Sequence, residues 1–259
     1  MSYPDPLPTV TRSLSDDVVV ILAPFDFLHV VPIGARTALF RYQNQVVVWL
    51  PLPYGDYIDE ALAKWGSNVS ISWVIVANTH HCMCAHQYKR RFPDARILAP
   101  EGTPLKEGCR ADVIIPKSLA RQKLLGDRLK SLGVDNVIVN NFEFEFLDQH
   151  YCDEVVTYEK NLKTLFVGDL LFNFDGEVEQ FQVGGPSWRH CMLWKVNPRN
   201  YYGQVVTCLF NMVFLPNSLA KEPLRVLVNE FDFDRVVMCH GNDLEGQDVK
   251  KVLVNALGL

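Results

Sequence analysis

The chain has 259 residues and a formal charge of −5; 48% of its residues are hydrophobic and 21% are charged. We expect one domain over residues 1–259 with a substantial core. Lysine and arginine are scattered along the chain, which argues against nucleic-acid binding. The N-terminus lacks a basic segment followed by an apolar one, and no apolar run reaches the roughly 18 residues of a membrane helix. We therefore expect no membrane contact and a cytosolic location.

The predicted elements of the first half alternate between strands and helices. β-branched runs bounded by proline and glycine predict strands at 17–24, 37–42 and 45–53. An amphipathic helix at 56–65 precedes an almost wholly apolar strand at 71–78. A short helix follows at 87–92, with strands at 96–100 and 111–116. Residues 118–133 are helical or extended.

A second β-rich block follows, and helices come after it. Its predicted strands cover 137–141, 142–147, 154–159 and 164–172, and a later strand covers 235–241. The predicted helices cover 200–214, 218–231 and 246–258. Two β blocks, each followed by helices, suggest two similar halves.

Ionisable residues recur where apolar strands end. His80 and His81 follow the strand at 71–78, Asp169 follows TLFVG, and His240 follows RVVMC. In layered α/β proteins this edge is where loops converge and ligands bind. A single histidine there is more simply a hydrogen-bonded loop residue, but four such positions together predict one shared site.

Four stretches carry these residues with distinctive neighbours: NTHHCMCAH at 78–86, QHYCDEVVTY at 149–158, TLFVGDLLFN at 164–173 and VVMCHGN at 236–242. Their order resembles the metallo-β-lactamase-like superfamily. The resemblance implies a four-layer αββα sandwich with a metal site along one edge of two facing sheets. With PLP at 51–53, RRFPDARILAP at 90–100 and FDRVVMCHG at 233–241, they resemble a lineage of that superfamily without an assigned reaction.

The first motif of the superfamily, His-x-His-x-Asp-His, fits the first stretch in two registers. In one register, His81 and His86 are its first and last members. In the other, His80 opens the motif, and Cys82 and Cys84 take the second histidine and aspartate positions. Neither register supplies the aspartate, so the motif is degraded.

The later motifs imply three more ligands. His150 matches a metal-binding histidine, although the flanking glycine and proline of the superfamily are absent. Asp169 matches the metal-bridging carboxylate, and His240 matches the closing ligand. The implied metal ligands are thus His80, His81, His86, His150, Asp169 and His240. Asp169 and His86 are also the candidate catalytic residues.

These side-chain types fit a reduced metal site. Without the second-site aspartate, we expect one zinc ion with an open position and at most a weak second ion. Two histidines with Asp169 would also match an iron facial triad, and a metal-free protein is a further alternative. Four cysteines beside the motifs are thiolate ligands or, as we prefer, small buried residues: Cys82, Cys84, Cys152 and Cys239.

Our first functional hypothesis is a metal-dependent hydrolase that activates water against an ester, thioester, amide or phosphoester of an unidentified small-molecule substrate. One alternative is a catalytically silent αββα scaffold that binds a small molecule or a protein. Another is a mononuclear iron oxidoreductase that acts on a thiol. His190, in an aromatic-rich stretch, is a packed loop residue or lines a substrate pocket. No motif indicates a nucleotide cofactor.

Overall fold

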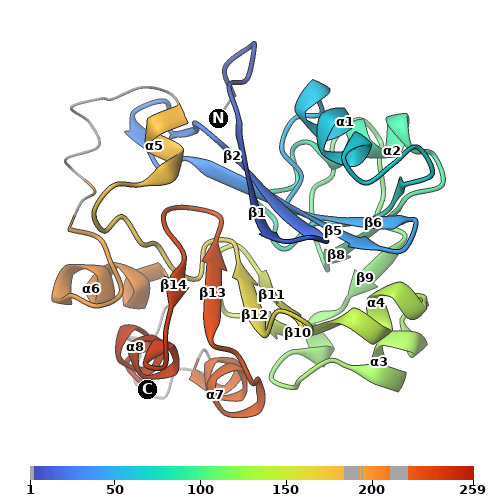
Figure 1. Ribbon diagram of the computed structural model, residues 1–259. Coiled ribbons are helices and arrows are strands. Elements are labelled where there is room, and N and C mark those ends of the chain that lie inside the picture. The colour runs from blue at the N-terminus through green and yellow to red at the C-terminus, as the bar shows by residue number, and fades with distance from the viewer. Residues whose placement is uncertain (1–2, 184–192, 194, 211–220) are drawn as a thin grey trace.

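Two facing β-sheets dominate the computed structural model, which describes residues 3–183, 193, 195–210 and 221–259 (Figure 1). The first sheet has the strand order β1-β2-β5-β6-β7-β8-β9. Its strands are β1 Val10–Ser15, β2 Val18–Ala23, β5 Ala35–Tyr42, β6 Gln45–Trp49, β7 Ser70–Ile75, β8 Arg96–Pro100 and β9 Val113–Ile115. The second sheet consists of β10 Phe142–Leu147, β11 Glu154–Glu159, β12 Thr164–Val167, β13 Arg235–Met238 and β14 Leu244–Glu245.

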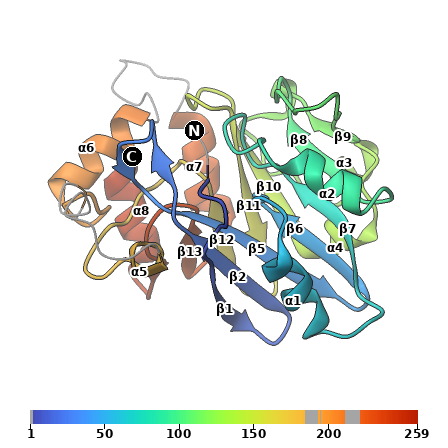
Figure 2. The same ribbon diagram turned by 90° about the horizontal axis from the view of Figure 1, so that it is seen from above.

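Helices cover the outer face of each sheet (Figures 1 and 2). On the first sheet lie α1 Asp56–Ala63 and α2 Ala85–Arg91, and on the second lie α7 Lys221–Glu230 and α8 Val249–Leu257. The remaining elements are α3 Gly126–Ser131, α4 Asn136–Asn141, α5 Glu179–Val183, α6 Tyr201–Phe210, the 3-10 turn Lys117–Leu119 and the hairpin of β3 Asp26–Phe27 and β4 Val31–Pro32. The predicted αββα sandwich is therefore confirmed.

Aromatic side chains fill the space between the sheets. Phe40 of β5 meets Phe142 of β10 and Phe166 of β12 edge to face, with ring centroids 5.2 and 4.9 Å apart. Trp49 of β6 also packs on Phe166, at 5.5 Å. Edge-to-face contacts of this kind add to the free energy gained by burial. The strands predicted from apolar runs thus share one core across both sheets.

The strand predicted at 137–141 is wrong, because VIVNN forms helix α4. The side chain of Asp135 caps this helix by accepting hydrogen bonds from the backbone N–H groups of Val137 and Ile138. Its other oxygen accepts a hydrogen bond from Nε1 of Trp73 at 2.9 Å. An aspartate at the N-cap stabilises a helix start, and here it outweighs the strand preference of the β-branched residues.

Predicted helices at 200–214 and 218–231 correspond to α6 and α7, and residues 211–220 between them lie outside the described residues. None of the helices in the described ranges is long and apolar enough to cross a membrane.

Strand β10 buries two glutamates. Its phenylalanines face the core between the sheets, and the alternate residues Glu143 and Glu145 face the other way. Such an outer face is often solvated, but here both carboxylates are buried. Glu143 pairs with Lys123 at 2.6 Å. Burial, with Glu230 nearby, raises the pKa of Glu145 to about 8.

Replacing Glu145 by glutamine should change how stability depends on pH. Folded Glu145 keeps its proton to higher pH than the unfolded chain does, so the free energy of unfolding falls as pH rises from about 4.5 to about 8. Glu145→Gln should remove this loss, on the order of 3 to 5 kcal/mol, when urea unfolding is measured at pH 5 and pH 8.5. The control Glu143→Gln, which removes the charge partner of Lys123, should destabilise at both pH values. Equal pH profiles for Glu145→Gln and the wild type would contradict the assignment.

Candidate metal centre

Parallel strands β12 and β13 bring Asp169 and His240 together. Their register pairs Val167 with Met238, so the residues two positions later, Asp169 and His240, also lie side by side. The backbone N–H of Cys239 donates to the carbonyl of Val167 at 2.8 Å and continues this pairing past the strand ends. The two candidate ligands of the second sheet therefore leave the same edge.

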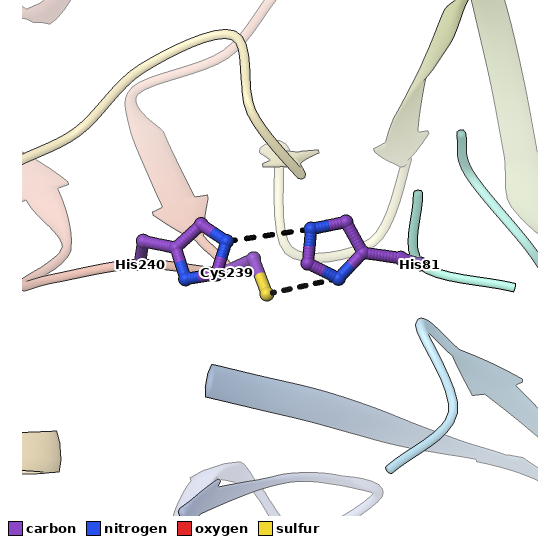
Figure 3. Close-up of side chains that lie close together, drawn as sticks. All are labelled: His81, Cys239 and His240. Carbon is purple, nitrogen blue, oxygen red and sulfur yellow. Dashed lines mark hydrogen bonds between the residues drawn. The ribbon is translucent and has the colours of Figure 1, made fainter. Parts of the chain in front are cut away.

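His81 reaches the same place from the first sheet, in the turn after β7 (Figure 3). Its Nε2 lies 3.2 Å from Oδ2 of Asp169 and 3.3 Å from Nε2 of His240. Nε2 of His240 lies 3.4 Å from Oδ1 of Asp169. Three predicted ligands from two sheets thus converge.

The other ring nitrogen of each histidine has a partner that orients the ring. Nδ1 of His240 lies 2.7 Å from the carbonyl oxygen of Gly34, which can only accept, so Nδ1 carries the proton. Nδ1 of His81 faces Sγ of Cys239 at 3.8 Å. With Nδ1 engaged, the Nε2 lone pairs are the ones left to meet an ion, as is typical of metal-binding histidines.

The spacing of these atoms fits a small tetrahedral ion. Two ligands at 2.0–2.1 Å from zinc are about 3.3–3.4 Å apart. The two Nε2 atoms lie 3.3 Å apart, and they lie 3.2 Å (His81) and 3.4 Å (His240) from Oδ2 and Oδ1 of Asp169, respectively. Cys239 Sγ, His81 and His240 also form a group whose ligand atoms lie within 4.8 Å of one another. The residues present therefore fit a metal ion.

Asn78, two residues before His80, holds the turn and the carboxylate together. Its Oδ1 accepts the backbone N–H groups of His80 and His81 at 3.0 and 2.9 Å. Its Nδ2 donates to Oδ2 of Asp169 at 3.0 Å. One buried amide thus fixes the position of His81 relative to Asp169.

Glu154 fixes Asp169 through the backbone of Gly168 and Asp169. Its two carboxylate oxygens accept the backbone N–H groups of Gly168 and Asp169 at 2.8 and 2.6 Å. A Cβ on Gly168 would lie 2.7 Å from Nδ2 of Asn78, so only glycine leaves room for this arrangement. Burial, and then the charge of Asp169, raise the pKa of Glu154 to about 7.

Arg36 of β5 supports the loop that carries His240. The guanidinium is fully buried and donates to the carbonyls of Met238 and Gly241 at 2.5 and 3.0 Å, on either side of Cys239 and His240. It also donates to Asp243 at 2.8 Å. The first sheet thereby holds a ligand loop of the second.

Histidines that favour a positive charge lie next to groups that favour a negative charge in the centre. Burial disfavours the charged form of His240, but Cys239 and Asp169 outweigh burial and raise its pKa to about 9. The same two groups raise the pKa of His81. Burial alone would raise the pKa of Cys239, yet the two histidines lower it to about 5. A divalent cation would replace protons that the histidines hold, so metal affinity should increase with pH.

A second group of side chains lies on the other side of Asp169. Sγ of Cys152 lies 3.5 Å from Oδ2 of Asp169 and 3.1 Å from Nδ1 of His150. His80, which is exposed, forms a group with Cys152 and Asp169 within 4.8 Å. Burial lowers the pKa of His150 to about 4, so its ring is neutral at physiological pH. These residues are where a weak second ion would be held.

The structure does not bring His86 to this centre. Its Nε2 lies 3.3 Å from Oε1 of Glu107, and it lines a separate open groove with Tyr54 and Gln87. His86 is in α2, whose first residue follows Cys84, so the helix carries it away from His81. This placement favours neither the ligand role nor the catalytic role predicted for His86. His190 lies outside the described residues.

Several groups in the centre had a signal in the sequence that was too weak to assign a role. Cys239 and Cys152 stood beside predicted ligands, and both are buried next to them. Asn78 could be read only as the end of a strand. The positions of Glu154 and Arg36 look like ordinary strand alternation, and only the packing of the two sheets reveals what they contact.

No family model and no curated protein matches the chain by sequence. Among solved structures, the chain is similar to a metallo-β-lactamase from Hirschia baltica, with a TM-score of 0.59, 12% identity and coverage of 96% of this chain and 98% of that one. It is also similar to a metallo-β-lactamase from Pontibacter korlensis, with a TM-score of 0.57, 14% identity and coverage of 97% of this chain and 98% of that one. For the metallo-β-lactamase FIM-1 from Pseudomonas aeruginosa, in its mono-zinc form, the TM-score is 0.57 and the identity 10%, with coverage of 97% of this chain and 95% of that one.

These matches cover nearly the whole chain at low identity. They show that the protein has the metallo-β-lactamase fold. Because one fold carries many activities, the reaction has to be argued from the centre itself.

Proposed function

We propose that the protein is a metal-dependent hydrolase with a reduced centre, in which His81, His240 and Asp169 hold one zinc ion. The observation that supports this most is the convergence of the two Nε2 atoms and the carboxylate at separations that match a tetrahedral ion. The mono-zinc form of FIM-1 shows that a protein of this fold is found with one zinc ion.

When bound, zinc would supply a Lewis acid and lower the pKa of water, the chemistry needed to hydrolyse an ester, thioester, amide or phosphoester. The residues of this chain have distinct parts in that arrangement. Gly34 and Cys239 orient the two histidine rings. Asn78 and Glu154 hold Asp169 in place. The substrate is a small molecule, and we keep the cytosolic location as a prediction.

Two histidines and one carboxylate are also the ligand set of mononuclear iron enzymes. That observation supports a second candidate, an iron oxidoreductase acting on a thiol. The identity of the metal separates the two candidates.

The test is elemental analysis of the untagged protein, purified without chelator, beside Asp169→Asn. The wild type should contain about one equivalent of zinc, and the variant, which keeps the size of the side chain but loses its charge, less than about one tenth. Circular dichroism should show that both are folded. Iron in place of zinc would favour the oxidoreductase.

A wild type that is purified without metal and takes up none on dialysis against zinc would contradict both enzymes. It would favour a catalytically silent αββα scaffold that binds a small molecule or a protein.

A further inference from the structure

An open groove of about 900 Å³ lies apart from the metal centre. Its walls come from four segments of the chain: residues 3–9 before β1, residues 53–60 at the start of α1, residues 83–87 at the start of α2, and residues 106–107 after β8. His86, a predicted metal ligand that the centre does not use, lines this groove, whereas Asp169 and His240 do not. A groove of this size has room for a small organic molecule.

Carboxylates outnumber cations along the groove. Asp5, Asp56, Glu60 and Glu107 line it, and Lys106 is the only lysine or arginine among its described lining residues. Within the described part of the chain, Asp5, Asp56 and Glu60 form no ion pair. Asp56 and Glu60 lie four residues apart on α1, where two like charges face each other and destabilise the helix. The groove therefore attracts cations and holds three charges that have no partner.

Two side chains that line the groove carry buried polar atoms without a hydrogen-bond partner. The side chain of His86 is 10% exposed, and its Nε2 lies 3.3 Å from Oε1 of Glu107. A carboxylate only accepts hydrogen bonds, so Nε2 carries the proton and Nδ1 keeps a lone pair. Among the described residues, Nδ1 of His86 and Oη of Tyr57 have no partner. A hydrogen-bond donor in the groove would supply what these atoms lack.

Aromatic and apolar side chains form the rest of the wall, among them Tyr3, Leu7, Pro53, Tyr54 and Tyr57. Tyr54 is fixed at both ends. Its backbone N–H donates to Oε1 of Gln87 at 2.7 Å, and its hydroxyl donates to Asp59 at 2.5 Å. The face of a tyrosine ring attracts organic cations, and methylene groups gain free energy by leaving water for such a wall.

The spacing of the acidic groups does not fit a metal ion. In the described residues, three groups of potential metal ligands have their atoms within 4.8 Å of one another, and none of them includes a residue of this groove. Asp5 belongs to the segment before β1, and Asp56 and Glu60 belong to α1. A ligand that carries several positive charges along a hydrocarbon chain would contact both segments at once.

We propose that this groove binds a small organic polycation of the polyamine class. Its ammonium groups pair with Asp5, Asp56 and Glu60 and donate to the unpaired atoms, while its methylene chain lies on the tyrosine rings. The groove is a second binding site, and it does not depend on the hydrolase reaction proposed for the metal centre.

The test titrates the full chain with three probes and follows the NMR signals of the backbone amides of Tyr54 and Tyr57. Spermidine carries ammonium groups on a hydrocarbon chain, octanediol has a chain without charge, and Mg²⁺ has charge without a chain. Spermidine should bind at least about tenfold more tightly than either of the others, and added salt should weaken its binding. If Mg²⁺ or octanediol binds as tightly as spermidine, the inference is overturned.

Two double variants with the same change in net charge locate the site. Asp56→Asn with Glu60→Gln should weaken spermidine binding about tenfold, because two ion pairs are lost. Asp94→Asn with Asp234→Asn is the matched control. Both of these exposed carboxylates lie outside the groove and form no ion pair within the described residues, so the control should weaken binding less than about twofold. Equal losses in the two double variants would overturn the inference.

Tyr57→Phe removes the unpaired hydroxyl and keeps the ring. Spermidine binding should weaken at least about threefold, yet the melting temperature should not fall, because the variant buries one polar group fewer. This variant keeps the test decisive if the double variant of α1 does not fold. Unchanged spermidine binding would overturn the inference.

The metal assay and this test give separate answers. Asp169→Asn should bind spermidine as the wild type does, since Asp169 does not line the groove. A protein that binds spermidine but takes up no zinc would support the groove and contradict the hydrolase. A protein that holds zinc without binding spermidine would overturn the groove assignment and leave the hydrolase proposal standing.

Discussion

Replacing His81 by alanine should weaken zinc binding at least about 100-fold, whereas His86→Ala should leave it unchanged. His81 contributes Nε2 within 3.3 Å of two other candidate ligands, and the ring of His86 pairs with Glu107 in another groove. His80→Ala should have an intermediate effect, because His80 lies beside Cys152 on the other side of Asp169. Zinc affinity is measured by competition with a chromogenic chelator.

This set of variants decides between the two registers of the first motif. All three replacements remove the same ring from the same nine-residue stretch, so each controls for the others. Circular dichroism and thermal unfolding should show that the proteins fold. Release of zinc by His86→Ala to the same extent as by His81→Ala would contradict the placement of His86 outside the metal centre.

Arg36→Met should lower the free energy of unfolding by about 3–5 kcal/mol. The variant removes a buried cation and leaves the carbonyls of Met238 and Gly241 without their donor, while Asp243 loses one of its two partners. Unfolding in guanidinium chloride, followed by tryptophan fluorescence, measures the change. Zinc affinity should fall as well, because both carbonyls flank the segment that carries His240.

Arg12→Met is the matched control. Arg12 also donates to Asp243, at 2.7 Å, but its side chain is 30% exposed. Because Arg12 keeps part of its contact with water, we expect its ion pair to contribute about 1 kcal/mol. A stability loss for Arg36→Met no greater than that for Arg12→Met would show that the buried guanidinium does not hold the loop.

Much of the fold could be predicted because apolar runs mark strands that are covered on both faces. The strands β2, β5, β7 and β12 all follow from such runs. Helix α4 could not be predicted from the same rule, since VIVNN has the composition of a strand and only Asp135 before it signals a helix start. A short capped segment is decided by one hydrogen-bonding side chain more than by its apolar pattern.

The candidate site was predictable where ligands directly follow strands. Asp169 and His240 leave neighbouring parallel strands in register, so their contact follows from the sheet. The histidines at 80, 81 and 86 lie in a turn and a helix start, and strand periodicity does not fix which ring points inward. The amide of Asn78 makes that choice through two backbone hydrogen bonds, a contact that no sequence spacing encodes.

The two-sheet origin of the ligands has a consequence for thermal behaviour. His81 comes from the first sheet, and Asp169 and His240 come from the second, so an ion bound by all three would cross-link the halves of the molecule. A ligand that binds only the folded chain stabilises it by about 2.7 kcal/mol at a free concentration one hundred times its dissociation constant. The melting temperature should therefore rise with the free zinc concentration. In a cell that is short of zinc, the same protein should unfold at a lower temperature.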